Sequence, residues 1–128
     1  MIIMDLSTNK QITVDFYQTA FDGNPAKAVA DHIGDRYIQH NPQAPDGPEA
    51  FIGFVEWLRG ENPELQLNIK RVIAEGDLVF THSELVLKPG TPGRALADIF
   101  RLENGKVVEH WDVIQDIPSE AANDNTMF

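Results

Sequence analysis

Three side chains in the C-terminal half of the chain have the types and spacing that proton transfer needs. His82, Asp98 and His110 fall in three successive segments rich in β-branched and aromatic residues, the composition of β-strands. If these segments pair as neighbours, the three side chains form a cross-strand row with Cβ atoms roughly 5 Å apart. An imidazole beside a desolvated aspartate can keep it ionised and orient it, so the row predicts an acid–base set.

These residues are expected to take distinct roles. Asp98 would be the base, and His110 or His82 the orienting donor or proton relay. Asp112 stands two residues after His110, on the same face of its strand, and is a further candidate for the acid or base. The alternative is a structural Asp98–His110 pair that only joins two strands.

The register of the last hairpin decides which side chains share a face. Its turn is Glu103-Asn104-Gly105, and Asn-Gly is a strong hairpin signal because both residues tolerate positive φ. A two-residue turn would set Asp98 opposite Trp111. A three-residue loop with a glycine bulge would set it opposite His110. The second register is preferred because it gathers Asp98, His110 and Asp112 on one face.

The position of His82 depends on the connection before that hairpin. Lys88–Gly93 has the composition of a turn, with two prolines and glycines. If this loop is symmetric about Gly90, His82 pairs directly with Asp98.

Helical spacing of apolar residues predicts helices in the first half of the chain. Ser7 or Thr8 is expected to cap the first, and Asn24 to cap the second ahead of a proline. The expected helices are Asn9–Phe21, Pro25–His32 and Glu49–Arg59. Trp57 on the third is interpreted as a packing residue.

The second half reads as strands. They are expected over Gln66–Ala74, Leu78–Leu87, Ala95–Leu102 and Lys106–Gln115, with Asp35–Ile38 as a short turn or strand. Helices followed by antiparallel strands indicate an α+β fold, with three N-terminal helices packed on one face of a strongly curved antiparallel sheet. A twisted sheet wrapped around helices forms a cone whose open end is a small-molecule pocket.

Composition excludes several classes of function. The 128 residues suit one domain, 1–128, in which 118–128 is a polar C-terminal tail. A net charge of −10 argues against nucleic-acid partners and anionic membranes. The absence of cysteine excludes thiol catalysis and thiolate metal sites. The start, MIIMDLSTNK, has no signal-peptide pattern and no apolar run is long enough to span a membrane, so a cytoplasmic protein is expected.

The order of elements and four motifs resemble the SnoaL-like group of the NTF2-like superfamily. The motifs are Tyr37-Ile38-Gln39-His40-Asn41-Pro42, Gly76-Asp77-Leu78-Val79-Phe80-Thr81-His82, Asp98-Ile99-Phe100-Arg101 and Asn104-Gly105-Lys106-Val107-Val108-Glu109-His110-Trp111-Asp112. The likeness covers nearly the whole chain. It implies the cone fold, but the superfamily includes cyclases, isomerases, hydrolases and members without catalysis.

Two patterns within the superfamily bear on the chemistry. SnoaL-type polyketide cyclases close a ring by intramolecular aldol reaction, with a pocket carboxylate as acid and base. Limonene-epoxide-hydrolase-like members carry an aspartate seven residues past the hairpin glycine, an offset that here falls on Asp112. They also need an Arg-x-Asp on the preceding strand, which His82-Ser83-Glu84-Leu85 lacks, so the resemblance does not favour epoxide hydrolysis.

The resemblance therefore implies proton abstraction next to a carbonyl, in an aldol-type cyclisation or an isomerisation, on a small apolar or carbonyl-containing ligand. Tyr37 could donate to an oxyanion, and His40 and Asn41 could orient a carbonyl. Phe100 and Ile114 supply apolar wall. The alternative is a non-catalytic module that binds a small ligand.

No cofactor and no metal are expected. Two histidines and an aspartate could form a facial metal set, but similar proteins seldom bind metal there. The opposite sheet face, which carries Glu109, Trp111 and Val113, forms the dimer contact in similar proteins, so a homodimer is expected. The tail is either frayed or tied down by Met127 and Phe128, across a dimer or within one chain.

Overall fold

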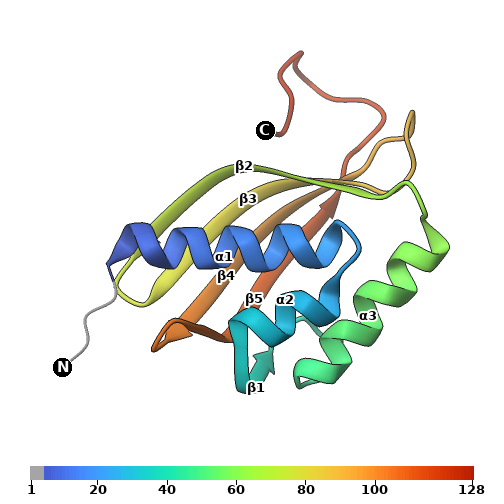
Figure 1. Cartoon of the computed structure of the whole chain (residues 1–128). Helices are drawn as coiled ribbons and strands as arrows, with labels where there is room; N and C mark the ends of the chain where they lie inside the picture. Colours follow the sequence, from blue (N-terminus) through green and yellow to red (C-terminus); the bar gives the residue numbers. More distant parts are fainter. Residues whose placement is uncertain (1–4) are drawn as a thin grey trace.

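A twisted sheet lies behind three helices in the computed structural model, which describes residues 5–128 (Figure 1). The first four residues, part of the stretch for which no signal peptide is expected, lie outside the described residues. The elements in chain order are α1 (Leu6–Phe21), α2 (Pro25–His32), β1 (Ile33–Gln39), α3 (Pro48–Glu61), β2 (Gln66–Glu75), β3 (Leu78–Val86), β4 (Arg94–Glu103) and β5 (Lys106–Asp116). The α+β fold is the expected one. No helix in 5–128 is long and apolar enough to cross a membrane.

The sheet is mixed, whereas a wholly antiparallel sheet was predicted. Its strand order in the described residues is β1-β5-β4-β3-β2. The strands β2 to β5 pair antiparallel, but β1 pairs parallel with β5. A loop and the helix α3 separate β1 from the strands that follow, so β1 can reach the far edge and run alongside β5.

The helices begin where polar side chains can cap them. The helix α1 starts earlier than predicted, because Asp5, and neither Ser7 nor Thr8, is its N-cap; the Asp5 carboxylate accepts from the Thr8 N–H at 2.7 Å. The predicted cap of α2 is confirmed, since Asn24 Oδ1 accepts from the Lys27 N–H at 3.2 Å.

Aromatic rings from the helices and the sheet form the centre of the core. Phe16 of α1 stacks on Phe51 of α3 with ring centroids 5.0 Å apart, and Tyr17 meets Phe100 of β4 edge-on at the same separation. Trp57 is not part of this core, contrary to the prediction, and its exposed fraction is 60%. It lies off the α3 stripe formed by the buried residues Phe51, Val55 and Leu58.

The β4–β5 hairpin follows neither predicted register. Asn104 (φ 50°) and Gly105 (φ 77°) form a two-residue turn between the paired residues Glu103 and Lys106. The register then shifts by one residue, because Leu102 pairs with Val107 but Arg101 pairs with Glu109. Val108 is the extra residue of this bulge.

This bulge determines which residues of β4 and β5 lie opposite each other at the site. Beyond it Asp98 lies opposite Asp112, not opposite His110 or Trp111. His110 is set opposite Phe100. The expected sharing of one face by Asp98, His110 and Asp112 is nevertheless found, because the bulge restores the inward phase that the two-residue turn alone would reverse.

The β3–β4 register places His82 away from Asp98, so the predicted three-residue row does not form. Thr81 lies opposite Asp98, and His82 lies opposite Ala97 on the outer face. The reason is a tight turn centred on the Pro89–Gly90 bond, closed by the Thr91 N–H donating to the Lys88 carbonyl at 3.2 Å. Proline followed by a glycine of positive φ (81°) is the pattern of a type II turn, which moves the loop's centre by half a residue.

The C-terminal tail is tied down within its own chain. The Phe128 ring lies 5.6 Å from the His82 ring, and Lys70 Nζ lies 5.8 Å from the centroid of Phe128. The tail therefore covers part of the outer face of β2 and β3. Of the two alternatives, the structure shows a tail that is tied down and not frayed.

Gly93 permits the close approach that starts β4. A Cβ built on it would lie 2.2 Å from the Leu85 carbonyl oxygen, a backbone atom that cannot move aside. We expect Gly93→Ala to lower the free energy of unfolding by about 2 kcal/mol or more, measured by urea denaturation.

The matched control is Gly53→Ala on α3, where an added Cβ meets nothing within 4 Å. Alanine in an exposed helical position should raise the free energy of unfolding by about 0.5–1 kcal/mol. Equal stability of Gly93→Ala and the parent protein would show that this approach does not set the register.

Candidate functional site

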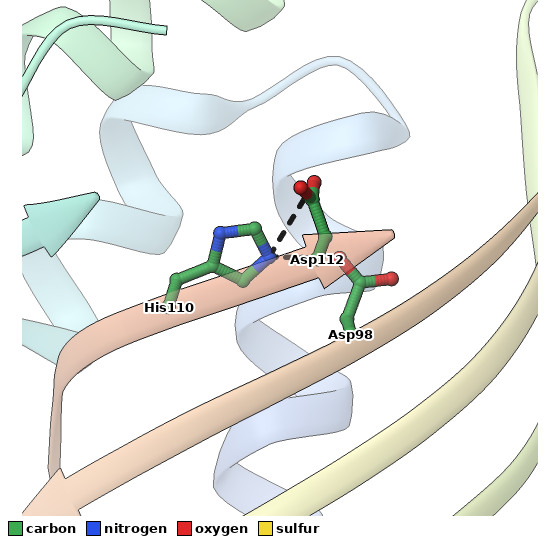
Figure 2. Close-up of side chains that lie close together, drawn as sticks. All are labelled: Asp98, His110 and Asp112. Atoms are coloured by element: carbon green, nitrogen blue, oxygen red, sulfur yellow. Dashed lines mark hydrogen bonds and ion pairs between the residues drawn. The ribbon is translucent and has the colours of Figure 1, made fainter. Parts of the chain in front are cut away.

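A fully buried aspartate is the centre of the polar cluster on the inner sheet face. The exposed fraction of Asp98 on β4 is 0%. Its Oδ1 accepts a hydrogen bond from the Tyr17 hydroxyl at 2.8 Å and lies 2.7 Å from His110 Nε2 on β5. Figure 2 shows the imidazole of His110 pointing toward the carboxylates of Asp98 and Asp112. One helix and two strands thus converge on this group.

The hydrogen bonds of His110 define where its protons lie. Its Nδ1 is 2.7 Å from Gln39 Oε1, and the backbone N–H of Asn41 donates to the same oxygen at 3.0 Å. Because a backbone N–H can only donate, that Gln39 atom is the carbonyl oxygen, and Nδ1 of His110 must carry a proton. The 2.7 Å contact between Nε2 and Asp98 therefore contains one more proton.

That proton makes the contact either an imidazolium–carboxylate pair or a neutral imidazole accepting from a carboxylic acid. The Tyr17 hydroxyl donates to the same oxygen of Asp98, which favours the carboxylate form. The pair sits among aromatic rings, with Phe100 at 4.9 Å and Tyr37 at 6.2 Å from the imidazole centroid. Low polarity around it strengthens the attraction of the two charges.

The two tyrosines around the pair remain neutral, and Tyr17 is the one that donates to it. Burial, followed by the nearby Asp98 charge, raises the pKa of Tyr17 well above its ordinary value of 10.0. The same causes raise the pKa of Tyr37. The Tyr37 hydroxyl is buried and has no hydrogen-bond partner within 5–128.

Asp112 connects the buried pair to the surface. Its Oδ2 lies 3.9 Å from His110 Nε2 and accepts from Asn41 Nδ2 at 3.1 Å. Burial raises the pKa of Asp112 above its ordinary value of 3.8, and the Asp98 charge adds to that rise; His110 and the Asn41 hydrogen bond oppose it. The exposed fraction of its side chain is 9%.

A pocket of about 330 Å³ opens over this carboxyl group. The loop after β1, the start of β4 and the end of β5 line it, through Asn41, Pro42, Gln43, Arg94, Asp112, Ile114 and Asp116. Asp98 and His110 are not among these lining residues. Asp112 is thus the member of the buried cluster that a ligand in this pocket would meet.

Two predicted histidines lie on the outer face. His82 Nδ1 is 3.0 Å from Arg71 Nη1, on the sheet face opposite to that of Asp98. His40 stacks on Trp111 at 4.8 Å, and its Nε2 lies 2.7 Å from Glu109 Oε2. Side chains alternate along a strand, so Gln39 points inward to His110 and His40 points outward.

The remaining predicted residues divide between the pocket and the core. Asn41 and Ile114, both predicted to contact a ligand, line the pocket. Tyr37 and Phe100 are core residues that surround the imidazole. The prediction missed Tyr17 and Gln39. Alternation in Gln39-His40-Asn41 could have identified Gln39, whereas Tyr17 looks like one more apolar residue of a helical stripe.

Asp98, His110 and Asp112 bring potential ligand atoms within 4.8 Å of one another. A cation bound to Asp98 Oδ1 and His110 Nε2 would have to replace the hydrogen bond that joins these atoms. The donor set therefore fits a hydrogen-bonded acid–base cluster better than a metal centre.

The fold is similar to that of several solved structures. TsrD from Streptomyces laurentii superposes with a TM-score of 0.73 at 21% identity, over 88% of this chain and 91% of that one. A protein from Jannaschia, proposed to be a SnoaL-like polyketide cyclase, gives 0.69 at 22% identity, over 89% and 90%. An NTF2-like protein of unknown function from Cytophaga hutchinsonii gives 0.69 at 14% identity, over 89% and 95%.

At these identities the likeness establishes the fold alone. No curated protein sequence matches this chain. The model of the SnoaL-like domain family matches residues 14–110, which include Tyr17, Asp98 and His110. Three quarters of the chain, from α1 to β5, is thus matched to one family, and the chain belongs to the SnoaL-like domain family.

Proposed function

We propose that the protein is a small-molecule enzyme that removes a proton from carbon next to a carbonyl, in an aldol-type cyclisation or an isomerisation. The observation that carries this proposal is a carboxyl group, Asp112, that lines a pocket and is backed by a buried His110–Asp98 pair. Structural similarity to proteins proposed to be polyketide cyclases supports the same reaction class.

The burial of each group assigns its role. Asp98 was predicted to be the base, but it is fully buried and already accepts from Tyr17. We therefore assign to Asp98 the role of orienting His110 and stabilising its protonated form. Asp112 meets the pocket, and a carboxyl group with a raised pKa is a stronger base than an ordinary one.

The proposed proton abstraction needs no co-reactant besides the substrate and these residues. The Asp112 carboxylate takes the proton as the C–H bond breaks, and the electron pair moves into the carbonyl to give an enolate. The negative charge thereby moves from the Asp112 carboxylate to the enolate oxygen, where the side-chain amide of Asn41, which also lines the pocket, can stabilise it by a hydrogen bond. The enolate carbon then attacks a second carbonyl, or Asp112 returns the proton to a different carbon.

The second candidate is a binding module without catalysis. It is favoured by the complete burial of Asp98 and the near-complete burial of His110, which also suits a structural pair. Proton exchange at a bound carbon acid distinguishes the two candidates.

The first test uses solvent-deuterium exchange into the central methylene of octane-2,4-dione, followed by NMR. The parent protein should accelerate this exchange, and Asp112→Asn should reduce the acceleration roughly 10²-fold or more, because the base is removed. Asparagine keeps an oxygen that can accept from Asn41. Asp35→Asn, on an exposed carboxyl group, is the control and should behave as the parent protein. An Asp112→Asn protein with parental exchange rates would exclude Asp112 as the base.

The second test is the pH dependence of that exchange. Only ionised Asp112 can accept the proton, so the catalysed rate should rise with pH through its pKa. The midpoint should lie above the ordinary carboxyl value of 3.8, because burial raises the pKa of Asp112. A midpoint at or below that ordinary value would contradict a desolvated base.

We also propose that the protein forms a homodimer through the outer face of the sheet. Large apolar side chains are exposed there, with Val113 at 73% and Ile73 at 59%. Ile99 and the His40–Trp111 stack adjoin Val113. Such a continuous apolar surface is costly to leave in water.

Val113→Asp should convert the dimer to a monomer, because it buries a charge in the contact. Sedimentation velocity over a range of protein concentrations measures the change. Leu6→Asp, at another exposed apolar residue, is the control and should remain dimeric. A parent protein that is monomeric at all concentrations would refute this contact.

A further inference from the structure

We propose that the substrate carries a carboxylate, which Arg94 binds at the outer end of the pocket while the reacting carbon lies at Asp112. This inference rests on the proposed proton abstraction and adds the chemical class of the substrate.

The sheet places the two groups at opposite ends of one pocket. Arg94 is the first residue of β4 and pairs across the hairpin with Asp116. Asp112 lies four residues before Asp116 on β5, which corresponds to about 13 Å along the strand. Arginine and aspartate side chains can lean toward each other and shorten that span. A ligand that touches both needs several bonds between its anionic group and its acidic carbon.

The guanidinium of Arg94 has N–H donors that no residue in 5–128 uses. Its Nε donates to Asp116 Oδ1 at 3.0 Å, and its two terminal nitrogens make no hydrogen bond to any residue in 5–128. The paired Asp116 side chain is 85% exposed, so water screens its attraction. The contact holds the guanidinium in one orientation while its outer edge stays available for a carboxylate.

The negative net charge of the protein makes the Arg94 cation significant for ligand binding. With a net charge of −10, the surface repels anions in general. Arg94 is the cationic side chain among the lining residues of the Asp112 pocket. It could therefore admit an anionic ligand to a pocket that otherwise repels one.

The wall between the two ends is partly apolar. Ile114 lies between Asp112 and Asp116 on the same face, lines the pocket and is partly exposed. Pro42 adds apolar surface from the loop after β1. Along the pocket a cation is followed by an apolar wall and then by the base. This order matches a ligand in which a short methylene chain joins a carboxylate to a carbonyl group.

The test compares two probes with the same carbon skeleton. 5,7-Dioxooctanoate is octane-2,4-dione with a carboxylate in place of the terminal methyl group. Binding is measured by NMR titration of the Ile114 amide and the Asn41 side-chain amide. The parent protein should bind the carboxylate roughly tenfold or more tightly than the neutral diketone, as expected for one charge-assisted hydrogen-bonded pair.

Arg94→Gln should remove this preference by weakening the carboxylate alone, whereas Arg94→Lys should keep part of it. Arg36→Gln, which removes a cation paired with Glu103 outside the pocket, is the matched control and should keep the full preference. Equal affinity of the parent protein for both probes, or no shift of either amide with the carboxylate, would overturn the inference.

Deuterium exchange separates this inference from the proposed function. Arg94-dependent binding of the carboxylate without any exchange would retain the anion site and refute the enzyme. Exchange that depends on Asp112 but is equally fast with both probes would retain the enzyme and refute the anion site. If both proposals hold, Arg94→Gln raises KM for the carboxylate about tenfold with little change in kcat.

Discussion

The contact between Asp98 and His110 is the constraint on which the rest of the site depends. Removing a carboxylate and an imidazolium from water costs about several kcal/mol for each ion, and such a pair persists only when it is close and well hydrogen-bonded. Here the two atoms are 2.7 Å apart, and both partners have a second hydrogen bond, Asp98 from Tyr17 and His110 to Gln39. Those partners come from α1 and β1, so the pair ties both elements to the central hairpin.

This arrangement also explains why we assign the proposed chemistry to Asp112. The buried pair is inaccessible and already committed, but its imidazole lies within 3.9 Å of a carboxyl group that borders a pocket. Asp112 is desolvated enough for its pKa to rise, while His110 and Asn41 moderate that rise. In the proposed function the buried charge pair serves as a fixed electrostatic environment for a more accessible group, as expected when preorganised dipoles and charges assist proton transfer.

The strand registers place the predicted histidines on different faces of the sheet. Four histidines occur in the chain, and of the two histidines predicted for the inner cluster only His110 belongs to it. His40 and His82 stand at positions of opposite phase and contact Trp111 and Phe128 on the outer face. Because the side-chain period of a strand is two, a shift of half a loop residue was enough to move His82 from the predicted site to the far side.

The sequence by itself determined the α+β class, the approximate position of each element and the family resemblance. Apolar periodicity and turn residues are local signals, and they were sufficient to place Asp98, His110 and Asp112 on one face. Tertiary structure alone decided the parallel addition of β1, the bulge at Val108 and the partners Tyr17 and Gln39. These features arise between residues distant in sequence, where burial and hydrogen-bond satisfaction select among registers that the local sequence leaves nearly equal in energy.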